Sequence, residues 1–141
     1  MLVLYAGSPI HLCSRALLSR PTAVEHILMS VRSGGSYWIA GSILAAELQQ
    51  IPDEQRRAVS LWLLELASEW PLLNPAIRAR GRELQGHGYG SFDALHLAFS
   101  EEFQCDYLLT TDDRFLRKAA RGIGQPSVTV ENPLNFLKVR A

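Results

Sequence analysis

The segment "FDALHLAFSEEFQCDYLLTTDDRFLRKAAR", residues 92–121, contains the patterns of a helix, a strand and a second helix in direct succession. Its first part places Phe92, Leu95 and Phe99 on one side of a helix, as in a helix that packs on a core. Residues 107–110 ("YLLT") form an apolar run of strand length. The last part begins with acids and ends with basic residues, as the helix dipole favours. This succession is typical of folds in which strands and helices alternate.

The rest of the chain continues the alternation. Further strands are predicted at residues 2–6 ("LVLYA"), 36–40 and 127–130, and helical patterns lie between them. Residues 2–6 are apolar throughout, which indicates a strand in the middle of a parallel sheet. A short helix is expected to begin with Ser42 as its cap, and a long amphipathic helix to extend over residues 52–70.

Length and composition narrow the possibilities. The 141 residues suit a single domain, residues 1–141, and the alternation predicts a three-layer α/β/α sandwich around a mostly parallel sheet. Lysine plus arginine and aspartate plus glutamate number 14 each, so the overall charge gives no support for a nucleic-acid or membrane-surface partner. Cys13 and Cys105 lack metal-ligand spacing and are expected to be buried thiols, which favours a cytoplasmic location.

Two adjacent aspartates, Asp112 and Asp113, follow the predicted strand at residues 107–110. The carboxyl ends of strands are the place where open α/β sheets carry their functional sites. The two residues also open a helix, so one of them can be a cap and the other an acid favoured by the helix dipole. A metal ligand is the alternative for one of them.

Two further acids lie near predicted strand ends. Asp93 begins a helix among apolar neighbours, either as a simple first-turn acid or as a carboxylate held near the protein body. Glu47 lies on the same helix side as Leu44 and Ile51, where an acid is costly unless it has a partner, such as an arginine, or a bound cation. Clustered carboxylates suit Mg²⁺ or Mn²⁺, which promote the attack of water on a phosphodiester.

Residues 92–121 resemble the C-terminal half of a PIN domain, the nuclease fold of VapC-type toxins. The shared pattern is an Asp-Ala-Leu-His-Leu-Ala helix at residues 93–98, a strand, and Thr-x-Asp at residues 110–112. Residues 41–48 ("GSILAAEL") resemble the Ser-x4-Glu-Leu helix of the family, and residues 128–137 ("VTVENPLNFL") resemble its closing strand and Asn-Pro turn.

The resemblance implies a Mg²⁺- or Mn²⁺-dependent endoribonuclease. Glu47, Asp93 and Asp112 would be its catalytic, metal-binding acids, and Thr110 would support them through its hydroxyl. Asp113 would help with a second ion or act as the helix cap, for which it is the better candidate. The resemblance also implies an RNA substrate, a homodimer and, for toxins of this class, a small antitoxin partner.

The first strand departs from the family pattern. PIN domains have an aspartate at the end of that strand, and Ala6 stands in its place here, with no acid anywhere before Glu25. The alternative is therefore a non-enzymatic RNA- or protein-binding module on a degenerate PIN scaffold. A phosphoryl-transfer domain of the haloacid-dehalogenase kind is disfavoured, because its aspartates would follow the first strand.

Three other features leave alternatives open. His96, at i+3 from Asp93, either orients that acid or a phosphate or is a histidine packed between helix and sheet. Trp62 and Trp70 belong either to the core or to a dimer or antitoxin surface. Most of the basic residues are expected on solvated faces, and Arg114, directly after the acid pair, is the best candidate to bind an RNA phosphate.

Overall fold

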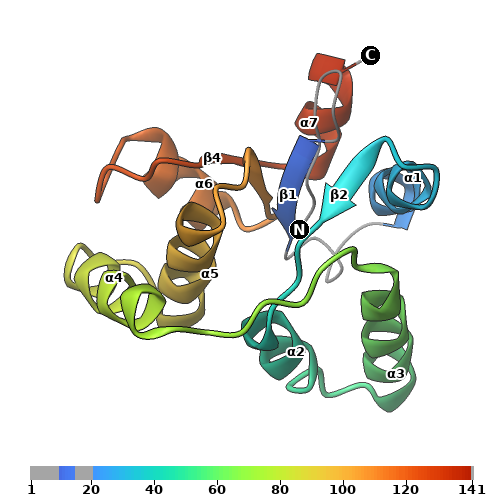
Figure 1. Cartoon of the computed structure of the whole chain (residues 1–141), viewed down its shortest axis with the longest axis horizontal. Coiled ribbons are helices and arrows are strands. Elements are labelled where there is room, and N and C mark those ends of the chain that lie inside the picture. Colours follow the sequence, from blue (N-terminus) through green and yellow to red (C-terminus); the bar gives the residue numbers. More distant parts are fainter. Residues whose placement is uncertain (1–9, 15–20, 141) are drawn as a thin grey trace.

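Four parallel strands form a sheet in the structure, a computed structural model that describes residues 10–14 and 21–140 (Figure 1). The strands are β1 (Ile10–Ser14), β2 (Ser36–Trp38), β3 (Tyr107–Leu109) and β4 (Thr129–Glu131). Their order in the sheet is β2-β1-β3-β4, and each neighbouring pair is parallel. The prediction of an α/β fold with parallel strands is confirmed for these residues.

Strand β1 lies in the middle of the sheet, between β2 and β3. Leu12 pairs with Tyr107 in the β1–β3 ladder, and Ile10 pairs with Ser36 in the β1–β2 ladder. The sequence does not predict this strand, because polar residues interrupt its apolar pattern. Residues 2–6, for which a central strand is predicted, lie outside the described residues, and Ala6 is among them.

Each of the four strands is followed by a helix. They are α1 (Pro21–Arg32), α2 (Ser42–Leu48), α3 (Glu54–Leu63), the 3₁₀ helix η2 (Leu64–Leu66), α4 (Pro75–Gly86), α5 (Ser91–Glu102), α6 (Asp113–Ala120) and α7 (Pro133–Arg140). Helix α5 packs against β1, β3, α2 and α4, and α1 packs against β2 and α7 (Figure 1). No helix in the described ranges combines the length and hydropathy that a membrane span requires.

The long helix predicted over residues 52–70 is wrong in its second half. Helix α3 ends at Leu63, a 3₁₀ turn follows, and Ala67 has an extended backbone with φ −61° and ψ 141°. Beyond Ala67 the chain pairs with the end of β2, where Ser68 N donates to the Trp38 carbonyl at 2.8 Å. This pairing across the fold satisfies the backbone in place of further helical hydrogen bonds, so tertiary structure overrides helix propensity here.

The start of α2 depends on a glycine. Ser42 is the first residue of the helix, and its N-cap is Gly41, so the prediction of a Ser42 cap is wrong. A Cβ at Gly41 would lie 2.6 Å from Phe99 Cε2 of α5. The ring of Phe99 is buried, so α5 approaches the backbone of Gly41 too closely for any side chain there. This contact sets the position of α2 against α5.

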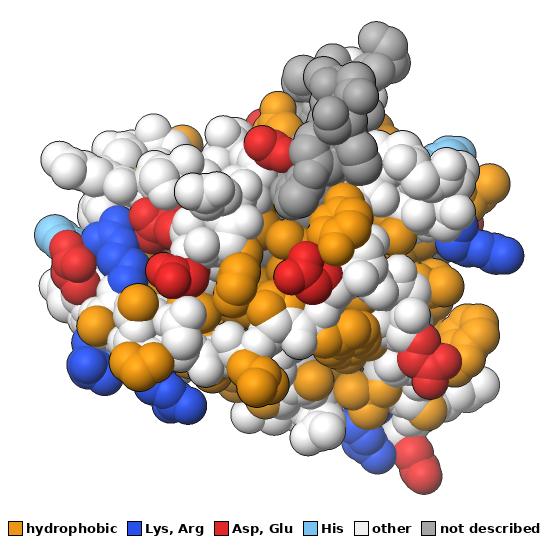
Figure 2. Space-filling model, in the orientation of Figure 1, with side chains coloured by type: hydrophobic (Ala, Val, Ile, Leu, Met, Phe, Trp, Pro, Cys, Tyr) orange, Lys and Arg blue, Asp and Glu red, His pale blue; other side chains and the backbone are white. Residues whose placement is uncertain are grey.

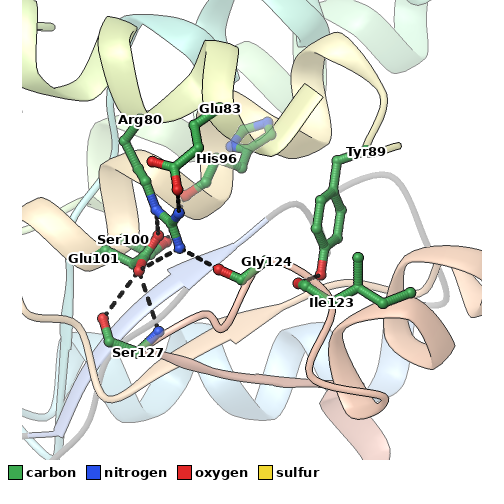
Figure 3. Close-up of polar contacts among 9 residues, drawn as sticks. All are labelled: Arg80, Glu83, Tyr89, His96, Ser100, Glu101, Ile123, Gly124 and Ser127. Carbon is green, nitrogen blue, oxygen red and sulfur yellow. Dashed lines mark hydrogen bonds and ion pairs between the residues drawn. The ribbon is translucent and has the colours of Figure 1, made fainter. Parts of the chain in front are cut away.

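A cluster around Arg80 joins α4, α5 and the loop before β4 (Figure 3). Arg80 Nε lies 3.0 Å from Glu101 Oε1, and Arg80 Nη2 donates to Gly124 O at 2.6 Å. Glu101 Oε2 in turn accepts hydrogen bonds from Ser127 N and Ser127 Oγ, both at 3.2 Å. Burial lowers the pKa of Arg80, but hydrogen bonds and charges of Glu101 and Glu83 outweigh it, so the pKa is raised.

Trp62 and Trp70 lie at the surface, with 65% and 46% of their area exposed. The core alternative for these two residues is therefore wrong. Val59 and Leu72 are also exposed. In Figure 2, hydrophobic side chains gather in the middle of the visible face, and lysines and arginines lie toward its edges. Cys105 is buried, as predicted.

Candidate functional site

Glu47 is a buried acid on the apolar side of α2. Its side chain is 8% exposed, and its helical neighbours Leu44 and Leu48 belong to the core. The predicted placement on the apolar side is therefore confirmed. The close packing at Gly41 brings α2 against α5, and Glu47 Oε1 lies 3.5 Å from His96 Nε2. The residue beside this acid is thus a histidine; an arginine is one partner that the sequence leads us to consider.

His96 is packed in the interior, the second of the two alternatives that its position in the sequence leaves open. It is 4% exposed, as expected for a histidine packed in the interior. Its ring also lies beside a candidate site acid, Glu47 of α2. Because both side chains are buried, water is scarce around them, and polar partners within the protein matter more for each.

Asp93 lies half-buried in the first turn of α5, whose N-cap is Gly90. Its Oδ2 would be 3.7 Å from a Cβ at Gly90, so the carboxylate lies over the start of the helix. Burial raises the pKa of Tyr89, the charges of Glu101 and Asp93 raise it further, and Arg80 opposes them. The Asp93 carboxylate therefore lies close enough to Tyr89 to contribute to the rise in its pKa.

Tyr89 holds the beginnings of α5 and α6 together. Its hydroxyl donates to Ile123 O at 2.6 Å (Figure 3). Its ring packs edge-on to Phe115 of α6, with the centroids 5.9 Å apart. Lys118 Nζ lies 5.4 Å from the centroid of the same ring and donates to Gly88 O. The first turns that carry Asp93 and Asp112 therefore lie on the same side of the molecule.

Asp112 is the N-cap of α6. Its Oδ1 accepts hydrogen bonds from Arg114 N at 2.9 Å and Phe115 N at 3.2 Å, while its own backbone is extended. Asp113 is the first residue of the helix, so the prediction that it is the better cap is wrong. The cap must precede the helix with an extended backbone, and the chain leaving β3 reaches that geometry at Asp112. Thr110 is 1% exposed, and its Oγ1 accepts a hydrogen bond from Asp112 N at 3.2 Å.

Replacement of Asp112 is expected to lower the stability of the protein more than replacement of Asp113. Asp112→Ala is expected to lower the free energy of unfolding by about 1 kcal/mol, because two amides of α6 lose their acceptor. Asp113→Ala removes only a first-turn charge, which is worth about 0.3–1 kcal/mol at low salt and less at high salt. Urea unfolding of both variants at high salt checks this, and a larger loss for Asp113→Ala would contradict it.

The predicted ligands do not assemble into a metal site in the described part of the chain. Among residues 10–14 and 21–140, no three histidine, cysteine, aspartate or glutamate side chains lie close enough together to hold an ion. Glu47, Asp93 and Asp112 provide the hard oxygen donors that Mg²⁺ and Mn²⁺ prefer. However, Asp112 Oδ1 is engaged in the helix cap and Glu47 Oε1 faces His96. The chemistry of the three acids therefore suits an ion, but the described residues do not gather three ligands around one point.

The first-strand aspartate of the family pattern is missing whether that strand is formed by residues 2–6 or by β1. Ala6 lies outside the described residues, and β1 ends at Ser14. The sequence has no aspartate or glutamate before Glu25, so neither segment can supply the carboxylate. A site at the carboxyl edge of this sheet has fewer negative charges than the family pattern provides.

Comparison with known proteins identifies the family. A family model described as the PIN domain matches residues 2–121 of the 141-residue chain. No curated protein matches the chain. PIN domains are generally nucleases, and PIN nucleases typically depend on metal ions. The match includes the helices that carry Glu47 and Asp93 and the turn that carries Asp112. By this match, which covers most of its length, the chain belongs to the PIN domain family.

Proposed function

We propose that the chain is a metal-dependent endoribonuclease that hydrolyses RNA phosphodiester bonds. The family match over residues 2–121 carries this proposal, because it joins the chain to a family of nucleases. The complete fold is then the three-layer α/β/α sandwich of that family. Burial of Glu47 supports the proposal, since an acid on the apolar side of a helix is expensive to keep without a functional reason.

The proposed site takes one acid from each of three elements. Glu47 of α2, Asp93 of α5 and Asp112 at the start of α6 bind Mg²⁺ or Mn²⁺, with Asp113 as support for a second ion. Such an ion, when bound, lowers the pKa of water and neutralises charge on a phosphate. Thr110 fixes the backbone of Asp112 through its hydroxyl.

A non-enzymatic RNA- or protein-binding module is the second candidate. Two observations favour it, namely the absence of any acid before Glu25 and the lack of three clustered ligands among the described residues. With this candidate, the chain binds RNA or a protein and does not turn it over.

The proposed partners follow from the surface and from the VapC-type resemblance. Exposed apolar side chains on α3 and in the segment after it suit a homodimer or a small antitoxin protein; they are Val59, Trp62, Trp70 and Leu72. We place such a toxin in the cytoplasm, where its RNA substrate is found.

Cleavage of a fluorescently labelled single-stranded RNA tests the proposal. The purified chain is expected to cut the RNA when Mn²⁺ is present and to stop when the ion is removed with EDTA, because the acids alone cannot neutralise the phosphate. Cleavage that continues at the same rate in EDTA would show a contaminating, metal-independent ribonuclease. A chain that cuts no RNA at any Mn²⁺ concentration would contradict the proposed function.

A further inference from the structure

Helix α6 carries three exposed arginines on one side. Arg114, Arg117 and Arg121 occupy positions i, i+3 and i+7, and all three are exposed. At 3.6 residues per turn, these positions fall within an arc of about 60° and extend over about 10 Å of helix. We call this set the α6 arginine row. Its first member lies two residues from Asp112, so the row begins at the proposed site.

The other side of α6 fixes the direction in which the row points. Phe115 is 1% exposed and packs on the ring of Tyr89. Lys118 is anchored beside the row by its hydrogen bond to Gly88 O. Rotation of the helix would break these contacts, so the three arginines are held toward solvent.

Among residues 10–14 and 21–140, no partner forms an ion pair or a side-chain hydrogen bond with the arginines of the row. Asp113 stands at i−4 from Arg117, the spacing of a helical ion pair, yet the two do not form one. The helix dipole accounts for basic residues at the end of α6. It does not account for Arg114, because a cation in the first turn is unfavourable.

We propose that the α6 arginine row binds the phosphate backbone of the RNA strand as it passes the proposed site, so that Arg117 and Arg121 extend the contact begun by Arg114. This inference rests on the proposed function for the identity of the ligand. A length of about 10 Å matches about three phosphates of a stacked strand, which are roughly 3.4 Å apart along its axis. Guanidinium groups bind phosphate oxygens in a bidentate manner.

The row favours RNA over an acidic protein. Asp112 Oδ1 already accepts from the amides of Arg114 and Phe115, so an anion at the row meets the arginine side chains in place of these two amides. In the described part of the chain, the exposed large apolar side chains belong to elements other than α6. A row of cations without apolar neighbours is typical of contacts to a nucleic-acid backbone.

Binding of a labelled, unstructured RNA in EDTA tests the row without cleavage. Arg117→Gln/Arg121→Gln is compared with Arg78→Gln/Arg82→Gln, which removes two exposed arginines from α4 and gives the same net charge. The slope of log K against log salt is expected to be smaller by about 1.4 for the α6 variant, at about 0.7 for each lost phosphate contact, and unchanged for the α4 variant. Thermal unfolding confirms that both variants fold.

The outcomes separate this inference from the proposed function. RNA binding that weakens only in the α6 variant supports the row, even if the parent chain cleaves nothing and the nuclease proposal fails. An equal loss in both variants, or no RNA binding by the parent chain, overturns it. Unchanged RNA affinity with lost binding of a polyglutamate peptide also overturns it, because the row then recognises acidic polypeptides.

Discussion

Asp93→Asn is expected to reduce Mn²⁺-dependent RNA cleavage by more than roughly 100-fold. Even residues that only support metal ligands cost up to about 100-fold in activity when they are replaced, and a ligand should cost at least as much. The substitution removes one negative charge and keeps the size of the side chain. It should cost no more than about 1 kcal/mol of stability, the worth of a first-turn acid at the N-terminus of α5.

Initial rates at saturating Mn²⁺ measure this loss. Glu54→Gln is a suitable control, because Glu54 is likewise a first-turn acid, is exposed on α3, and takes no part in the proposed site. The control is expected to cleave RNA at the rate of the parent chain. An Asp93→Asn variant that cleaves as fast as this control would remove Asp93 from the list of catalytic acids.

Gly41→Ala is expected to lower the free energy of unfolding by about 1–3 kcal/mol, the usual cost of overpacking a core. The added Cβ would meet Phe99 Cε2 at 2.6 Å and Phe99 Cζ at 2.9 Å. The ring is buried and cannot swing into solvent, so α2 must move away from α5. Because Glu47 and His96 face each other across these two helices, RNA cleavage should fall as well.

Gly86→Ala provides the matched control in a urea unfolding experiment. Gly86 ends α4, and a Cβ there meets nothing within 4 Å. Alanine in a helix without a clash stabilises by about 0.4–1 kcal/mol, mainly by restricting the unfolded chain. The two variants are therefore expected to change stability in opposite directions. Equal stability of Gly41→Ala and the parent chain would show that α5 does not hold α2 by this contact.

The elements that local patterns specify were predictable from the sequence. An Asn-Pro pair predicts a cap followed by the first helical residue, and Asn74 caps α4 by accepting from Ile77 N at 2.9 Å, with Pro75 as the first residue of that helix. Strand β3 and helix α5 also lie where their apolar spacing predicts. In these segments local propensity and tertiary structure agree.

The predictions from sequence are wrong where contacts with distant parts of the chain determine the local structure. Helix α3 stops early because the backbone after Ala67 pairs with Trp38, almost 30 residues earlier, and no local pattern reveals that pairing. The strand β1 owes its place to ladders with β2 and β3 on both sides and not to its own hydropathy. The capping role of Asp112 depends on one residue of register, which periodicity does not fix.

The candidate site could be predicted as a set of acids but not as an arrangement. The cost of burying Glu47 indicates a partner, and only the fold shows that His96 is beside it. The packing of Tyr89 between the beginnings of α5 and α6 is likewise a property of the fold. The exposed row of arginines on α6 becomes apparent once Phe115 is known to face the interior.

Ala6 is the position at which nuclease function is tested most directly. RNA cleavage is measured over a titration of Mn²⁺ for the parent chain and for Ala6→Asp, side by side, with Asp93→Asn in the Ala6→Asp background as the control. The parent chain is expected to cleave slowly, and the added carboxylate to raise the rate by at least about tenfold, the effect of one further ligand or support at a metal site. If neither protein cleaves RNA at any Mn²⁺ concentration while both still bind it, the chain is a binding module and not a nuclease.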